Sequence, residues 1–501
     1  MAIIGAGCGL VVLAYEAISK FVDFAVGPFD SRIPGLGILL VAIAALTLAL
    51  ASLDWRRGLW FLMFWLVIAD IVRRLLPSQP PQLMLVADLI VAGIYIGYFV
   101  ETVLFGHKRR LKWPSAFLAS LALFATVSVV GMFNPALPTF WFGFVGLHSY
   151  AWFLPLVFVG TSFSQDSQKS LDLMLFVSAL CIPLFFLAIY QYFHFGTLPV
   201  ALQSVRGGLD YHSFGNEAIP LISSAFGNAE KYSRYCALAL FLSVAMLGDL
   251  QLSVGRRVLA FTSACVALGG IFVSDRRTPL YLCLVGLLFV AWKMRYVFRT
   301  ATFWVSLLLI CVLAGFAHLR HSQEIASSSE YFVSSLPEIQ ERVNFLLDEI
   351  SVVTNGAGLL GRGTGADSQG LDYVPGGAPL LTAHGVSIEN GLTKVWWELG
   401  PFGLASFLLF WFVAGGLLFK KAVRARNSRA CSYALCYATY FCIIFVWFTK
   451  GHQVMGDVAT GIDQWFFFGI IAGLPLLPNS KSLPNQIRRE PVRPALKRCA
   501  S

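Results

Sequence analysis

Long uninterrupted runs of apolar residues dominate the chain and alternate with short polar stretches. A hydrocarbon core about 30 Å thick is crossed by roughly 20 apolar residues in a helix. Backbone polar groups in lipid must be bonded within their own segment, and continuous runs exclude strands, which would show alternation. The pattern therefore predicts an all-α polytopic membrane protein with about 14 transmembrane helices, at approximately 4–26, 34–52, 58–75, 86–105, 113–131, 148–163, 173–195, 234–249, 257–274, 279–296, 301–318, 391–419, 431–449 and 462–478.

Two long polar stretches, 196–233 and 319–390, interrupt this pattern, and loops of such length are usually functional or separately folded. In the second, Ser335 and Glu338 have capping-box spacing and precede apolar residues at helical spacing. This predicts an amphipathic helix on the outer leaflet or over the membrane domain. The chain then divides into helices 1–7 (1–195), a loop with helices 8–11 (196–318), the large loop (319–390), helices 12–14 (391–478) and a basic tail (479–501).

Composition supports a membrane protein: 57% of residues are apolar, 13% are charged and the mean hydropathy is +0.71. Soluble domains carry about 25% charged residues, and this shortage of charge argues against disorder and against nucleic-acid binding. The net charge is +10, and most basic residues lie in short loops or in the tail, all on one predicted side of the membrane. By the positive-inside rule, both termini are expected in the cytoplasm and both long loops outside.

Several arginines depart from this rule. Arg276 and Arg277 lie in VSDRRTPL at the predicted outer mouth, and Arg206 and Arg234 belong to the first long loop and the span after it. Arginine makes bidentate, charge-assisted bonds to phosphate, so these residues are candidates for binding a phosphate or pyrophosphate group. The alternative is local ion pairing. It accounts well for Arg73 and Arg74, which can pair with Asp70 or Asp88, but Asp275 can neutralise only one of Arg276 and Arg277.

The segment TAHGVSIENGLTKVWWELGPFGLASFLLF, 382–410, carries the most chemistry. His384 can act as a general base near neutral pH, and a carboxylate such as Glu389 can do so if burial raises its pKa. Asn390 can orient a hydroxyl group. The alternatives are that His384 is an ordinary surface residue and that Lys394 and Glu398 simply pair along the helix. We find no metal-ligand cluster and no Walker lysine–hydroxyl pair in the glycine-rich stretch NGAGLLGRGTGADSQG, so neither a metal nor another cofactor is expected.

These features resemble the O-antigen ligase/polymerase superfamily of polytopic glycosyltransferases, over roughly residues 200–420. Members have one large periplasmic loop late in the chain that ends in a motif like H-N-x-x-L-x-x-x-x-E-x-G-x-x-G. Here Glu389-Asn390-Gly391-Leu392 leads to Glu398, Gly400 and Gly403 at matching spacing, with Glu389 where the family usually has histidine. VSDRRTPLYLCLVGLLF, SVRGGLDYHSFGNEAIP, SSAFGNAEKYSRYCALAL and LLGRGTGA resemble further family regions and carry Arg276, Arg277, Arg206, Arg234 and Arg362.

The resemblance implies a GT-C-like, metal-independent inverting glycosyltransferase of the bacterial inner membrane, with its active site at the periplasmic face. The donor would be an undecaprenyl-pyrophosphate-linked glycan, whose pyrophosphate would be held by these five arginines. His384 or Glu389 would be the base, with Asn390 beside it. The product would be O-antigen or exopolysaccharide made by polymerising repeat units, or lipopolysaccharide if the enzyme is a ligase that acts on lipid A core. Membrane lipids, a chain-length regulator and a flippase would be partners.

Two other classes of protein remain. A transporter or flippase of lipid-linked or anionic substrates would need charged or broken helices near the bilayer midplane, whereas the ionisable residues here cluster near the predicted membrane faces. A non-catalytic scaffold of a polysaccharide export complex would leave the outer arginines without a purpose. The transferase is therefore the leading hypothesis.

Overall fold

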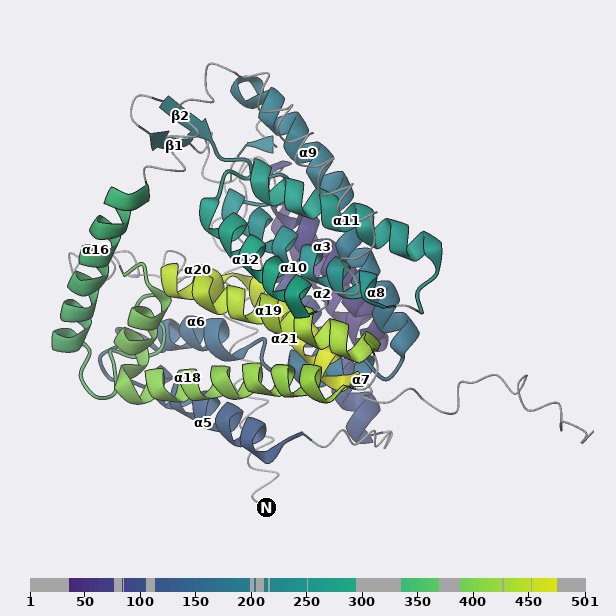
Figure 1. Ribbon diagram of the computed structural model, residues 1–501. Coiled ribbons are helices and arrows are strands. Elements are labelled where there is room, and N and C mark those ends of the chain that lie inside the picture. Colours follow the sequence, from purple (N-terminus) through teal and green to yellow (C-terminus); the bar gives the residue numbers. More distant parts are fainter. Residues whose placement is uncertain are drawn as a thin grey trace, which may run out of the picture.

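The computed structural model describes residues 36–75, 83, 85–104, 113–198, 202–203, 211–214, 217–249, 251–293, 335–368, 388–425, 428–451 and 453–474. In these ranges the chain forms a bundle of helices (Figure 1). They are α2 (Leu36–Leu53), α3 (Trp55–Leu75), α4 (Leu85–Phe99), α5 (Ser115–Met132), α6 (Phe140–Ala151), α7 (Leu156–Phe163), α8 (Ser167–Ala179), α9 (Cys181–Phe193), α10 (Ala229–Leu247), α11 (Val254–Val273), α12 (Arg277–Lys293), α16 (Ser335–Gly356), α18 (Gly391–Arg424), α19 (Ser428–Lys450), α20 (Gln453–Gly456) and α21 (Val458–Gly473).

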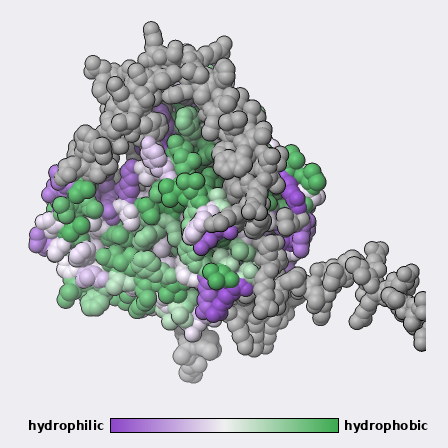
Figure 2. Space-filling model, in the orientation of Figure 1, coloured by the Kyte–Doolittle hydropathy of each residue, from purple (hydrophilic) through white to green (hydrophobic). Residues whose placement is uncertain are grey.

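Twelve of the fourteen predicted apolar segments fall on these helices, and the other two, 4–26 and 301–318, lie outside the described residues. Among the described residues, seven candidate spans are long and apolar enough to cross a membrane, and two shorter apolar helices, Thr278–Lys293 and Val458–Gly473, accompany them. The protein is therefore a polytopic helical membrane protein. Large apolar side chains are exposed along these helices, and Figure 2 shows a broad hydrophobic area with hydrophilic patches around it, as expected for a surface that faces lipid.

Within the described residues, one short pair of strands accompanies the predicted helices. Strands β1 (Tyr211–Phe214) and β2 (Glu217–Pro220) pair antiparallel within the first long loop, with Tyr211 opposite Pro220. Short irregular elements also join the helices: a π-helical turn, η2 (Val100–Leu104), continues α4, and a 3-10 turn, η3 (Phe195–Thr197), follows α9. The loop lacks the long apolar runs that predict spans, so backbone pairing between two short segments satisfies its polar groups instead.

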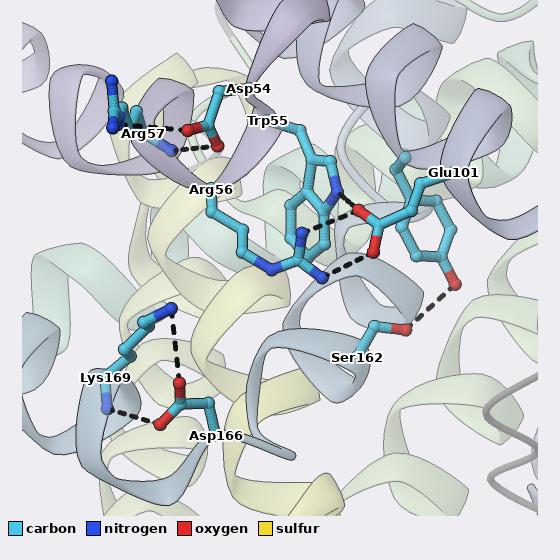
Figure 3. Close-up of polar contacts among 9 residues, drawn as sticks. Asp54, Trp55, Arg56, Arg57, Glu101, Ser162, Asp166 and Lys169 are labelled. Carbon is cyan, nitrogen blue, oxygen red and sulfur yellow. Dashed lines mark hydrogen bonds and ion pairs between the residues drawn. The ribbon is translucent and has the colours of Figure 1, made fainter. Parts of the chain in front are cut away.

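Basic side chains predicted for one side of the membrane gather at one end of the bundle. Arg56, at the start of α3, donates two hydrogen bonds of 2.7 Å to Glu101 of η2, and Figure 3 shows Lys169, at the start of α8, paired with Asp166 in the same view. Arg256, at the start of α11, donates to Asp172 of α8 at 2.7 Å. We call this the basic end.

The other ends of the helices meet at the opposite end of the bundle. Asp70, near the last turn of α3, accepts a hydrogen bond of 2.6 Å from the backbone N–H of Gly227 just before α10. Lys231, in the first turn of α10, pairs at 3.1 Å with Asp457, which directly precedes α21. The start of α18 lies at this end as well, because Gly391 packs against Phe448 in the last turn of α19. We call this the site end.

Helix α18 is broken near its start. Gly400 has φ 71° and ψ −177°, which is a region that only glycine adopts readily, and Pro401 follows it. The break separates a short first part, 391–399, from the long apolar part that packs on α5 and α19. Since proline lacks an N–H and the helix is interrupted, carbonyl groups on the last turn of the first part lose their partners within the helix.

A neighbouring turn of the chain supplies those partners. The backbone N–H of Arg362 donates to the carbonyl of Trp397 at 2.8 Å, and that of Gly363 donates to the carbonyl of Glu398 at 2.9 Å. The carbonyl of Trp397 is the one that the missing N–H of Pro401 would have served in a regular helix. The turn in GRGTG, 361–365, therefore completes the hydrogen bonding of the broken helix.

The same turn is fixed from the other side by α5 and α6. Thr364 donates to the carbonyl groups of Gly131 at 3.0 Å and, through its hydroxyl, of Ser128 at 2.8 Å. Gly146 of α6 approaches so closely that a Cβ there would lie 2.2 Å from the backbone nitrogen of Gly365. Only small residues permit this contact, so α5, α6 and α18 enclose the turn.

We expect Gly400→Ala to destabilise the protein. A Cβ at Gly400 would lie 2.2 Å from the carbonyl oxygen of Leu359, and the backbone conformation alone costs about 1–3 kcal/mol for a residue with a side chain. The thermal unfolding midpoint in detergent, followed by tryptophan fluorescence, should fall by several degrees. Gly416→Ala in the same helix is the control, because a Cβ there meets nothing within 4 Å. Equal midpoints for the two variants would contradict this account of the break.

Candidate functional site

The first turn of α18 is capped by two side chains from different parts of the chain. Asn390 is the N-cap, and its side-chain oxygen accepts from the backbone N–H of Leu392 at 2.8 Å. Glu349 of α16 accepts from the backbone N–H groups of Glu389 and Asn390 and from the Thr393 hydroxyl, the last at 2.8 Å. A carboxylate at a helix N-terminus is favoured by the helix dipole. Glu349 thus fastens α16 to the start of α18.

Glu389 and Arg362, the two exposed residues of the predicted site, border a small apolar core. Ile388 and Trp397 of the α18 segment pack there with Val353 of α16 and with Ala357 just beyond it. Glu389, the residue after Ile388, is exposed. The guanidinium of Arg362, also exposed, lies over the ring of Trp397 with its carbon 5.4 Å from the ring centroid. The structure therefore brings Glu389, Asn390 and Arg362 to one region.

Beneath this surface, acidic side chains are buried against the broken helix. Glu398 is fully buried, and its Oε1 accepts from the backbone N–H of Asp367 at 2.9 Å and from the Ser368 hydroxyl at 3.4 Å. Its side chain also interacts with the buried hydroxyl group of Tyr150 on α6. Lys394, one turn earlier on α18, is also buried and interacts electrostatically with Asp367. The motif residue Glu398 thus holds a loop carboxylate in place.

The carboxyl group of Asp367 is tuned by these surroundings. Burial raises its pKa, the nearby Lys394 lowers it, and the negative charges of Glu398 and Glu349 raise it again. The net effect is a pKa of about 7, well above the usual value of 3.8. Asp367 is therefore an acid that changes its charge near neutral pH, at the site end of the bundle.

A second charged cluster lies where α10 and α21 begin. Asp457, the N-cap of α21, pairs with Lys231 at 3.1 Å and with Arg234 at 3.6 Å, and it accepts from the Thr460 hydroxyl at 2.6 Å. Burial alone would raise the pKa of Asp457, but the two cations and these hydrogen bonds lower it to about 2. Asp457 is therefore ionised at neutral pH and offsets one of the two positive charges.

Arg234 is the least satisfied member of this cluster. It is 3% exposed, and its Nε and Nη1 have no hydrogen-bond partner in the part of the chain that the structure describes. Its guanidinium carbon lies 5.9 Å from the ring centroid of Trp447, next to Phe448, against which the start of α18 packs. The two clusters therefore flank the last turns of α19.

The remaining arginines have different surroundings. Arg276 is half-buried between α11 and α12, and its Nε lacks a hydrogen-bond partner among the described residues. Arg277 is the first residue of α12, but its side chain lies outside the described part. Arg206 and His384 also lie outside the described residues. Lys450, at the end of α19, donates to the hydroxyl group of Thr278 in the first turn of α12. A further cation therefore lies at the site end.

The structure confirms ion pairing for Arg73, whereas Arg74 is bonded mainly by backbone carbonyl groups. Arg73 lies 3.8 Å from the carboxylate of Asp70. Arg74 donates to backbone carbonyl groups, among them that of Ala225 at 2.7 Å. Asp88, the other predicted partner, instead pairs with His148 at 2.8 Å. These two arginines are therefore structural.

The structure also shows residues of this region that the sequence analysis did not single out: Glu349, Asp367, Lys231 and Asp457. Asp457 carries a local signal, because an aspartate three residues before Thr460 at the start of an apolar run is an N-cap pattern. Glu349 and Asp367 carry none, since their partners lie more than 30 residues away in sequence. Gly403, predicted to support the motif, lies against Leu399. A side chain at 403 would place its Cβ 2.0 Å from the Cβ of Leu399, so only glycine lets the helix after the break pack there.

No family model matches the chain, and no curated protein is significantly similar to it.

We expect Asp367→Asn to stabilise the protein in a pH-dependent manner. The pKa of Asp367 is about 7 in the folded protein and has its ordinary value of 3.8 in the unfolded chain. Between these two pH values, the folded protein keeps a proton that the unfolded chain has released. The wild-type protein therefore loses stability as the pH rises through this window, and the asparagine variant does not. Its unfolding midpoint should match that of the wild type near pH 4 and exceed it at pH 8.

The control for this measurement is Asp348→Asn, which changes an exposed carboxylate on α16. Its midpoint should follow that of the wild type at every pH. A constant difference between Asp367→Asn and wild type from pH 4 to pH 8 would show that Asp367 does not carry the raised pKa.

Proposed function

We propose that the protein is a membrane glycosyltransferase that moves an oligosaccharide from a polyprenyl pyrophosphate to an acceptor sugar, polymerising repeat units of an O-antigen or exopolysaccharide. The active site would lie at the site end of the bundle, on the periplasmic face of a bacterial inner membrane. The resemblance of residues 200–420 to the O-antigen ligase/polymerase superfamily suggests this activity, and the geometry around α18 and α10 supports it.

The observation that carries the proposal is the unsatisfied guanidinium of Arg234. Buried N–H groups are nearly always bonded, and two of its nitrogens lack partners among the described residues. Phosphate oxygens are the natural partners for a rigid arginine fork. Asp457 pairs with both Lys231 and Arg234, and Asp70, which also acts on Lys231, pairs with Arg73. The three cations exceed the two carboxylates, so the cluster retains a positive charge for an anion.

The chemistry requires a proton acceptor and a site for the leaving group. An acceptor hydroxyl would attack the anomeric carbon opposite the pyrophosphate, the bond from that carbon to the pyrophosphate oxygen would break, and a base would take the hydroxyl proton. Arg234 and Arg276 would stabilise the charge that builds on the departing pyrophosphate. Glu389, exposed at the start of α18, and His384 are the candidate bases from the sequence motif.

The test is the glycan profile of cells that carry single arginine variants. Arg276→Ala and Arg234→Lys should reduce polymerised glycan at least tenfold on gels, with equal amounts of protein in the membrane. Lysine at 234 keeps the charge beside Asp457 but loses the fork. Arg57→Ala is the control, because Arg57 is 90% exposed and pairs with Asp54 at the basic end. Normal profiles in both site variants would contradict a pyrophosphate site.

The same gel separates polymerase from ligase. In a strain that lacks the gene, single repeat units that remain attached to their anchor would identify a polymerase. The absence of all attached repeats would identify a ligase that transfers glycan to lipid A core. We expect the first result.

A second candidate function is transport of a lipid-linked or anionic substrate. Two observations favour it: α18 is discontinuous, and Asp463 and Gln464 of α21 are buried with side-chain atoms that lack hydrogen-bond partners within the described ranges. A transporter would leave the glycan on its polyprenyl carrier. Accumulated lipid-linked repeats on the cytoplasmic face of the deletion strain would therefore favour transport over transfer.

A further inference from the structure

The carboxyl group of Asp367 stands out among the polar groups at the break in α18. Its backbone N–H is bonded to Glu398, which fixes the residue, while its side-chain Oδ2 is buried and has no hydrogen-bond partner among the described residues. The residue itself is partly exposed, so the group is held at the boundary between the bundle and the outside. An aspartate that only stabilised a turn would bond the backbone near it.

Two further polar groups lie at the same place. Tyr150 on α6, 7% exposed, interacts with the fully buried Glu398 through a side-chain hydrogen bond, and its interaction with Asp367 is electrostatic only. Among the described residues, the Oδ2 of Asp367 is therefore the acceptor at this place that remains open to a hydroxyl-bearing ligand.

We propose that Asp367 is the base that deprotonates the acceptor sugar hydroxyl, with Glu398 and Lys394 as positioning residues. This inference rests on the proposed transferase function and names the residue that the sequence motif leaves open. Glu389, the motif candidate, is exposed to solvent, whereas Asp367 is partly withdrawn from it, and a carboxylate in a less polar site is the stronger base.

The charges that face Asp367 come from each element packed against it. Lys394 and Glu398 belong to α18, Glu349 to α16 and Tyr150 to α6. Lys394 favours the ionised carboxylate, and the two glutamates oppose it. The resulting pKa of about 7 suits a base that must be ionised at neutral pH and still accept a proton readily.

In the reaction step, the acceptor O–H bond breaks and its proton passes to Asp367. The acceptor oxygen forms a bond to the anomeric carbon, and the electron pair of the bond to pyrophosphate leaves with the pyrophosphate oxygen. Because the residue is partly exposed, the protonated carboxyl can return its proton to water before the next cycle.

The test measures transfer in membranes with a short polyprenyl-pyrophosphate-linked oligosaccharide from pH 5 to pH 9. Wild-type kcat should rise with pH and level off above about pH 7, where the carboxylate is ionised. Asp367→Asn should lower kcat at least about 100-fold, the usual contribution of a general base, with an unchanged KM for the donor. Asp367→Glu should keep part of the activity with a displaced pH profile.

Asp348→Asn, which changes an exposed carboxylate on α16, is the control and should keep the wild-type pH profile. Glu389→Gln removes the other candidate carboxylate and separates the two assignments. A wild-type profile in Asp367→Asn, or a displaced one in Glu389→Gln, would overturn the assignment of Asp367 while leaving the transferase intact. If Asp367→Asn is unfolded, as its melting curve would show, an unchanged profile in Asp367→Glu overturns the assignment instead. A wild-type protein that transfers nothing would refute the proposed function, and the assignment would fall with it.

Discussion

The break in α18 imposes the constraint on which the rest of the site depends. Backbone carbonyls that lose their helical partners inside an apolar bundle cost several kcal/mol each unless another donor reaches them. Here the N–H groups of Arg362 and Gly363 reach the carbonyls of Trp397 and Glu398. Any fold that keeps Gly400 and Pro401 in α18 must therefore keep the 361–365 turn beside them.

This requirement joins parts of the chain that are distant in sequence. The turn carries Arg362 and positions Asp367 over Glu398, while Glu349 caps the same helix from α16. The cluster of Arg234 and Asp457 lies beside Trp447, and Phe448, the next residue of α19, packs against the start of α18. A loop that is polar in sequence thus becomes part of a rigid, partly buried site, and such fixed polar groups are what charge stabilisation in a reaction requires.

The sequence predicted the helices well because long apolar runs leave the backbone few alternatives in lipid. It missed the interruption within the predicted span 391–419, where Gly400 leaves the helical conformation. The motif spacing groups Glu389, Asn390 and Glu398, and the structure brings Arg362 beside them, over the ring of Trp397. The sequence did not indicate that Glu349 and Asp367 belong to the site, because their contacts depend on how α16 and the glycine-rich turn pack. It also did not indicate that Arg234 is almost fully buried.

The most direct measurement of the central claim uses the purified protein in liposomes with a polyprenyl-pyrophosphate-linked oligosaccharide as sole substrate. The products are the released polyprenyl pyrophosphate and the lengthened glycan, both separated by chromatography. The account predicts that they appear together, one pyrophosphate for each unit transferred, without added nucleotide. An oligosaccharide that stays on its carrier, whether or not it crosses the bilayer, would contradict it.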